Sequence, residues 1–113
     1  MKAVNTSKEM VIAADLKEAA GFFPRLLGLM GRDRLEKDEG LWMARCSAIH
    51  TFWMKFPIDV VFLDGDFIVK KTVQGLRPFR PGVSCRHAKG VLELPEGTIE
   101  RAQIQIGDLV TIV

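Results

Sequence analysis

The spacing of apolar and polar residues predicts a chain made mainly of short strands. Apolar runs of about four to seven residues recur along the sequence and are bounded by glycine, proline or aspartate, as is typical of buried and half-buried strands. Asp64-Gly65-Asp66 separates two of these runs and is a strong hairpin signal. We predict strands at residues 10–14, 41–44, 49–54, 58–63, 67–73, 91–94 and 109–113.

One segment has a helical period instead. Its apolar positions recur every three or four residues, a proline stands where the first turn would be, and a glycine follows the last apolar position. We therefore predict a short helix near residues 22–30, with Leu26, Leu27 and Met30 buried beneath it. A single helical turn is also expected at residues 98–102.

These elements indicate a mostly β fold, either a single-domain β-sandwich or a distorted small barrel with one or two short helices. A chain of 113 residues has room for one core. Residues 1–113 are therefore expected to form one domain, in which residues 1–8 can be flexible. The 48% hydrophobic and 27% charged content is that of a folded globule rather than a disordered chain.

Charge and hydropathy limit the partners and the compartment. A net charge of +2 is too small to indicate a nucleic-acid or membrane surface, and no segment approaches the roughly 18 apolar residues of a membrane span. We expect neither a nucleic-acid partner nor a membrane span. Because Lys8 and Glu9 interrupt the N-terminal apolar stretch, there is no leader pattern, and the cytoplasm is the expected location.

Asp59 interrupts an apolar face. In a strand over 58–63 it would share that face with a valine and a leucine. A buried carboxylate needs a cation or several hydrogen-bond donors. We expect Asp59 to be buried and charged, with Lys55 or an arginine or lysine of residues 77–89 within salt-bridge distance. An Asp59 that faces a ligand is the alternative.

A basic loop follows later in the chain. Residues 75–90 are rich in glycine and proline, which marks a loop, and loops on a rigid sheet tend to carry binding residues. The segment has no acidic residue, and its basic residues are Arg77, Arg80, Arg86, His87 and Lys89. Because a guanidinium group suits carboxylate or phosphate, the loop is either an anion site or a solvated basic loop, with an arginine that can pair with Asp59.

The cysteines and histidines do not predict a metal centre or any other cofactor. In extended chain Cys46 and His50 lie roughly 13 Å apart, too far for one zinc ion with bonds of about 2.0–2.3 Å. A disulfide between Cys46 and Cys85 is geometrically open, but a reducing cytosol argues against it. A Cys–His nucleophile pair lacks a recognisable motif and a third orienting group. Trp42 and Trp53 are core residues or, alternatively, a surface for sugar stacking.

Four stretches carry a resemblance to a known family. They are "RLLGLMGRDRL", "IHTFWMKFPIDVVFLDGD", "VLELPEG" and "IQIGDLV". In this order and spacing the chain resembles the DUF192 family, also called UPF0127, over roughly residues 10–113. The resemblance implies a compact β-sandwich-like domain without an established biochemical activity. Many relatives carry a secretion leader, and we expect none in this chain.

The combined interpretation is a non-catalytic binding or accessory module with a small anionic or polyhydroxylated, sugar-like ligand. The alternative is a small hydrolase-like enzyme that uses His50 and Asp59 as acid and base, which requires both groups at one open cavity. The expected ligand-binding residues are His50, Thr51, Trp53, Lys55, Asp59, Arg77 and Arg80.

Overall fold

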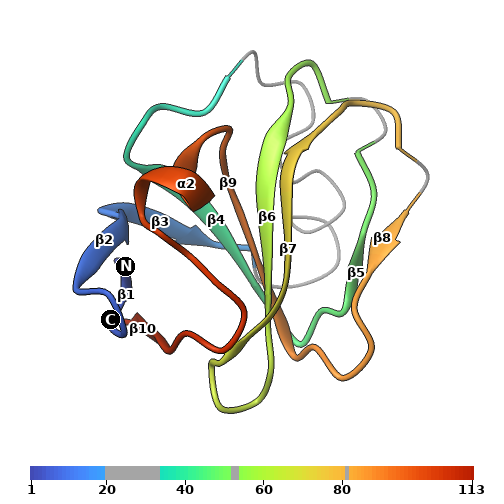
Figure 1. Cartoon of the computed structure of the whole chain (residues 1–113). Coiled ribbons are helices and arrows are strands. Elements are labelled where there is room, and N and C mark those ends of the chain that lie inside the picture. The colour runs from blue at the N-terminus through green and yellow to red at the C-terminus, as the bar shows by residue number, and fades with distance from the viewer. Residues whose placement is uncertain (20–33, 52–53, 81) are drawn as a thin grey trace.

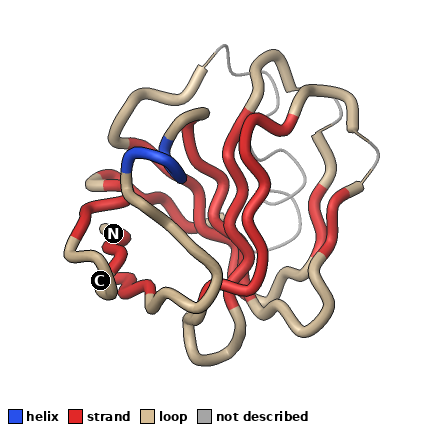
Figure 2. Tube along the Cα trace, in the orientation of Figure 1, coloured by secondary structure: helices blue, strands red, loops and turns tan. Residues whose placement is uncertain are grey.

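The computed structural model describes residues 1–19, 34–51, 54–80 and 82–113. Strands dominate this part of the chain, and α2 (Thr98–Arg101) is a short helix among them (Figure 2). The helix predicted near residues 22–30 lies outside the described residues and stays a prediction. The strands are β1 (Ala3–Asn5), β2 (Met10–Ala13), β3 (Asp15–Glu18), β4 (Glu39–Ala44), β5 (Ala48–Ile49), β6 (Ile58–Leu63), β7 (Val69–Leu76), β8 (Val83–Ser84), β9 (Gly90–Pro95) and β10 (Val110–Ile112).

The strands are arranged around a central five-stranded sheet in the order β3-β4-β9-β6-β7. A three-stranded sheet, β10-β1-β2, lies on one side of it, and the β5–β8 pair lies on the other (Figure 1). β3 runs parallel to β4, and the other described pairings are antiparallel. Both faces of the central sheet are thus available for a core.

The strand β6 contributes to two cores because successive side chains point to opposite faces. Val61 and Leu63 belong to the first core, which also contains apolar residues of the three-stranded sheet. Val60 and Phe62 belong to the second core, on the β5–β8 side. All six residues of β6 are buried, which explains its nearly unbroken apolar sequence.

The sequence predicted the fold class and most strands correctly. The strand predicted at 58–63 coincides with β6, and those at 10–14, 41–44, 67–73, 91–94 and 109–113 overlap β2, β4, β7, β9 and β10. The helical turn expected at residues 98–102 is α2. The fold is a small, mostly β domain of stacked sheets, which in the described residues do not close into a barrel.

The strand predicted at residues 49–54 is mostly wrong in the residues that the structure describes. Ile49 belongs to the strand Ala48–Ile49, and His50, Thr51 and Met54 lie outside it. The amide of Met54 donates to the carbonyl of Thr51 at 3.3 Å, a bond between residues three apart in sequence rather than a ladder bond to a neighbouring strand. Apolar composition indicated a strand, but local backbone hydrogen bonds decided against one.

Three of the strands were not predicted from the sequence pattern. β3 has a largely polar, exposed sequence and β8 is a two-residue strand inside the proline-rich loop. β1 lies within residues 1–8, for which flexibility was expected, yet it pairs with β10 on one side and β2 on the other. Each of these strands is defined by pairing with a neighbour that is distant in sequence or separated by a loop, β3 with β4, β8 with β5 and β1 with β2 and β10, and its own sequence pattern does not indicate that pairing.

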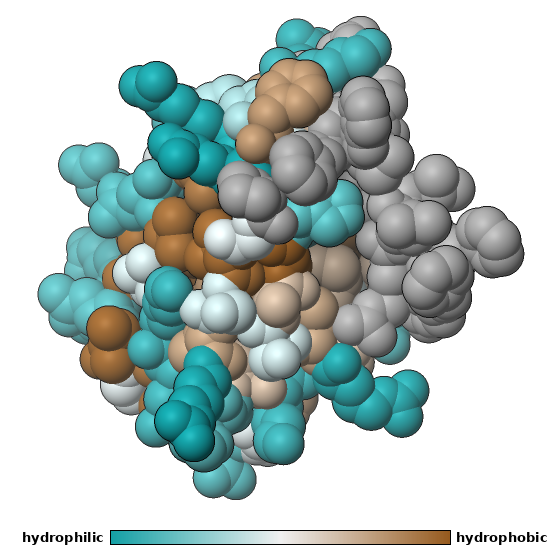
Figure 3. Space-filling view, turned by 90° about the vertical axis from the view of Figure 1, so that its right-hand side faces the viewer, coloured by the Kyte–Doolittle hydropathy of each residue, from teal (hydrophilic) through white to brown (hydrophobic). Residues whose placement is uncertain are grey.

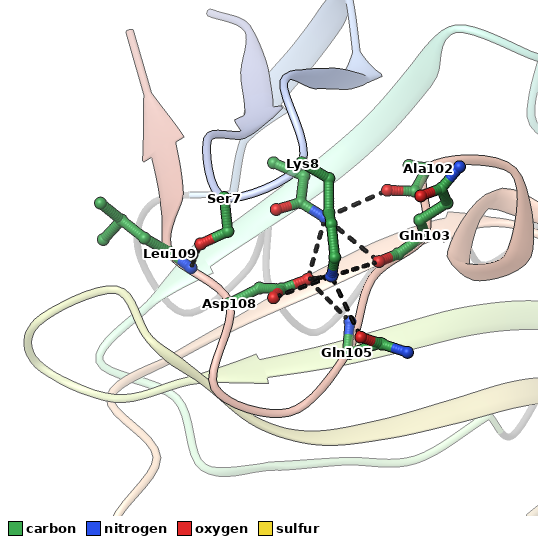
Figure 4. Close-up of polar contacts among 8 residues, drawn as sticks. Ser7, Lys8, Ala102, Gln103, Gln105, Asp108 and Leu109 are labelled. Carbon is green, nitrogen blue, oxygen red and sulfur yellow. Dashed lines mark hydrogen bonds and ion pairs between the residues drawn. The ribbon is translucent and has the colours of Figure 1, made fainter.

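The two ends of the chain lie together. The backbones of Lys2 and Val113 exchange hydrogen bonds of 2.8 and 2.9 Å, and Lys8 Nζ contacts both carboxylate oxygens of Asp108 at 2.8 and 3.0 Å (Figure 4). Asn5 also donates to Asp108, at 3.1 Å. Burial alone would raise the pKa of Asp108, but hydrogen bonds from Lys8, Gln105 and Asn5 outweigh it and hold that pKa below its ordinary value. We call Lys8 and Asp108 the end clasp.

Candidate functional site

Asp59 is a buried structural junction. Its side chain lies on the first-core face of β6 and the residue is only 1% exposed. One carboxylate oxygen accepts the amide of Gly75 at 2.9 Å, and the other accepts the amides of Gly97 and Ile99 at 3.0 and 2.9 Å. The carboxylate therefore connects β6 with β7 and with the start of α2.

Local backbone geometry presents these amides to the carboxylate. Gly75 and Gly97 both have positive φ, 60° and 96°, a conformation that glycine adopts without steric cost. The β6–β7 register shifts between Ile58 and Val60, which is where Asp59 lies. The sequence prediction was right that Asp59 is buried and wrong about its partner, because in the described residues backbone amides, and no lysine or arginine, bind it.

Thr51 holds the basic loop against the segment that precedes β6. Its hydroxyl donates to the carbonyl of Arg77 at 2.7 Å and accepts the amide of Arg80 at 2.8 Å. Its backbone amide donates to the carbonyl of Arg80 at 3.1 Å, and its carbonyl accepts the amide of Phe79 at 2.8 Å. Thr51 is fully buried, so it positions the loop backbone through these bonds.

A groove opens where this loop meets β7. Its volume is about 440 Å³, within the range of small-ligand sites. The exposed side chains of Arg77 and Arg80 are at the groove, and an apolar band is visible in the middle of this side of the molecule (Figure 3). The lining residues are Val73, Gln74, Gly75, Leu76, Arg77, Arg80, Gly82 and Val83.

The predicted site residues divide into separate groups. Arg77 and Arg80 line the groove, and Thr51 supports their backbone. His50 and Lys55 are exposed and do not line it. Trp53 lies outside the described residues, so its predicted role is untested. Asp59 is turned to the first core, and none of its hydrogen bonds involves His50.

The sequence interpretation missed one unusual carboxyl group. Glu93 is in the middle of β9, between Leu41 of β4 and Val60 of β6, and is 5% exposed. Burial raises the pKa of Glu93 to about 7. The only sequence signal is a glutamate in the apolar run "VLELP", which reads equally well as a solvent-facing position of a half-buried strand.

The cysteines are free thiols, Cys46 buried and Cys85 partly buried. The β5–β8 ladder pairs Ala48 with Ser84, and the amide of Cys85 donates to the carbonyl of Ser47. The residue directly opposite Cys85 is therefore Ser47 and not Cys46. Because directly opposed residues are the ones whose side chains share a face, this register does not place the two thiols opposite each other. Within the described residues, no group of three or more His, Cys, Asp or Glu side chains is arranged to hold a metal ion.

Solved structures with the same fold include two bacterial proteins. A protein of unknown function from Novosphingobium aromaticivorans superposes with a TM-score of 0.85 at 23% identity, over 98% of this chain and 82% of that one. A protein titled putative transcription regulator from Sinorhizobium meliloti has a TM-score of 0.81 at 21% identity, over 97% of this chain and 89% of that one. At these identities the likeness establishes the fold alone.

In the described part of the chain, no helix has the length and apolar character needed to cross a membrane.

Sequence comparison extends over nearly the same length. The DUF192 family, described as "Uncharacterized ACR, COG1430", matches residues 3–112. A UPF0127 protein of Pyrococcus furiosus is 34% identical over 109 residues, which cover 93% of this chain and 92% of that protein. A UPF0127 protein of Pyrococcus horikoshii is 34% identical over 108 residues, covering 93% of each. The resemblance found in the four sequence stretches is confirmed, and the chain belongs to the DUF192 (UPF0127) family.

Proposed function

We propose that the protein is a non-catalytic binding module for a small anionic ligand, which it takes up in the groove beside β7. The observation that carries the proposal is the position of Arg77 and Arg80 on one groove of about 440 Å³. Two guanidinium groups within one concave surface suit a carboxylate or phosphate. The buried anchor Thr51 favours a fixed loop backbone beneath them.

The charge of the surrounding chain supports an anion. Residues 67–92 contain no aspartate or glutamate, and the Glu96 carboxylate, whose Oε2 lies 2.7 Å from where a Cβ on Gly75 would be, comes from outside this segment. The lysines and arginines of the segment are Lys70, Lys71, Arg77, Arg80, Arg86 and Lys89. A polyhydroxylated ligand has less support, because Trp53, the predicted stacking surface, lies outside the described residues.

We do not extend the proposal to the hydrolase alternative. That mechanism needs Asp59 to exchange protons with a substrate. Both of its oxygens accept backbone amides, and the residue is 1% exposed. This arrangement favours a structural role for Asp59.

The proposal is tested by NMR titration of the uniformly ¹⁵N-labelled protein with acetate, inorganic phosphate and, as a neutral control, glucose. We expect the anions to shift the amides of residues 73–77 and 82–83, and glucose to leave them unchanged. The double variant Arg77→Gln/Arg80→Gln should bind the anions at least tenfold more weakly.

The matched control is Arg86→Gln, which removes an exposed arginine of the same loop that does not line the groove. It should bind like the native protein. If Arg86→Gln weakens binding as much as the double variant, the effect is one of net charge and the proposed site is wrong. Amide shifts of equal size with glucose and with the anions would also contradict the proposed site.

A further inference from the structure

The groove is bounded by two chemically different surfaces. Val73, Leu76 and Val83 form its apolar part. All three belong to or pack against the second core, Leu76 being buried and the two valines half-buried. A ligand placed there would cover the outer edge of that core and remove apolar surface from water, which is favourable in proportion to the area covered.

The charged part of the groove is small. Arg77 and Arg80 provide two positive charges. Glu96 lies close by, because its Oε2 is 2.7 Å from where a Cβ on the lining residue Gly75 would be. Two cations with one neighbouring carboxylate balance about one negative charge on a ligand. A polyanion such as a nucleotide triphosphate would carry several charges with no partner.

We propose that the ligand of this groove is an amphiphilic monocarboxylate, an aliphatic or aromatic acid with a single negative charge. This inference rests on the proposed anion-binding function and adds the chemical class of the ligand. The carboxylate is bound by Arg77 and Arg80, and the apolar body lies along Val73, Leu76 and Val83. Gln74 supplies an amide for a polar substituent.

A homologous series of acids tests the apolar part. Acetate, butanoate and hexanoate are titrated into the ¹⁵N-labelled protein, with hexan-1-ol as the uncharged partner of hexanoate. Each methylene that enters the apolar part should tighten binding about fourfold, from the free energy of burying one CH₂ group. Hexanoate should therefore bind far more tightly than acetate, inorganic phosphate or hexan-1-ol.

A blocking variant tests the location. Gly82 lines the groove, and among the described residues no atom lies within 4 Å of where a Cβ on Gly82 would be, so we expect the leucine of Gly82→Leu to be accommodated and to reduce the space for a ligand. It should weaken hexanoate binding at least tenfold and leave the melting temperature of the free protein nearly unchanged. Gly65→Leu is the control, since Gly65 does not line the groove and a Cβ there would lie 3.7 Å from Lys89 Cγ, an ordinary contact and the one found among the described residues.

The outcomes separate the two proposals. Acetate or phosphate binding as tightly as hexanoate would overturn the monocarboxylate inference and leave the anion-binding function standing. Hexan-1-ol binding as tightly as hexanoate, or no groove shift with any anion, would overturn both. Hexanoate binding that survives in Gly82→Leu would place the ligand elsewhere and overturn the inference.

Discussion

Asp59 and Glu93 lie on neighbouring strands of the central sheet and are almost equally buried, but their side chains are in different environments. They are 1% and 5% exposed, and the register pairs Asp59 with Leu94 and Val60 with Glu93. Asp59 points to the first core and accepts three backbone amides. Glu93 points to the second core, where burial raises its pKa to about 7. Two carboxyl groups of similar burial therefore have different hydrogen-bond partners, because the donors that each face supplies differ.

The difference between the two faces has a structural origin. On the Asp59 side, the β6–β7 register shift and the first turn of α2 leave amides that are not used in strand pairing. These amides donate to the Asp59 carboxylate. On the Glu93 side, the flanking strands β4 and β6 contribute Leu41 and Val60 at the same level. Regular ladders use their amides for pairing and leave none for a side chain.

Removal of the Asp59 carboxylate should have the largest effect. Asp59→Ala leaves three amides without their acceptor, one in a buried and two in partly buried hydrogen bonds, and we expect the free energy of unfolding to fall by about 4 kcal/mol. Urea denaturation at pH 7 measures it. Asp66→Ala, an exposed aspartate in the β6–β7 turn, is the control and should cost less than about 0.5 kcal/mol. Equal losses in the two variants would mean that the amides of Gly75, Gly97 and Ile99 do not depend on Asp59.

The pH dependence of stability should report Glu93. Its folded-state pKa of about 7 is above the unfolded value of 4.5, so the folded protein retains the proton longer than the unfolded chain. The resulting stability is complete below pH 4.5 and is lost as the pH rises to about 7, by about 3 kcal/mol in total. Urea denaturation from pH 5 to pH 8 measures this decline.

Substitution of Glu93 by its neutral analogue provides the decisive comparison. Glu93→Gln should flatten the profile between pH 5 and pH 8 and make the variant more stable than the native protein at pH 8. Glu100→Gln, an exposed carboxyl on α2, should keep the native profile. A native profile that does not decline in this range, or that Glu93→Gln leaves unaltered, would contradict the raised pKa.

Loss of the end clasp should change the free energy of unfolding less than the substitutions of Asp59 and Glu93 do. Asp108 has a true cation partner, but the Lys8 side chain is 28% exposed, and partly solvated ion pairs contribute little. Lys8→Met should reduce the free energy of unfolding by about 1 kcal/mol. The pKa of Asp108 is lowered in the folded state, so the clasp stabilises above the unfolded pKa of Asp108 and weakens as the pH falls through its folded value.

A matched control for the clasp is Lys17→Met, because Lys17 pairs with Asp15 at 3.3 Å in a more exposed setting. Thermal unfolding at low and high salt compares the two variants. We expect Lys17→Met to change the melting temperature less than Lys8→Met does. The reverse order would show that the contacts of Lys8 with Asp108, Gln103 and Gln105 add nothing beyond surface charge.

Side-chain pattern was a good guide to burial and a poor guide to partners. The valine and leucine that share a face with Asp59 in residues 58–63 correctly predicted that Asp59 is buried. Its donors could not be predicted, because Gly75 and Gly97 are far from it in sequence and their amides are presented only by local backbone turns. Glu93 shows the converse failure, since its strand is central only once β4 and β6 have paired on both sides of it.

The sequence alone determined the mostly β fold, the β6–β7 hairpin, the family and the acid-free basic segment that contains Arg77 and Arg80, because these depend on residue type and on short-range spacing. Tertiary structure alone decided which apolar residues accompany those arginines, which amides bind Asp59, and that Glu93 is buried between two strands. Each of these depends on segments that are distant in the chain and are brought together by strand order and register. A one-dimensional pattern contains no information on such neighbours until the sheet has formed.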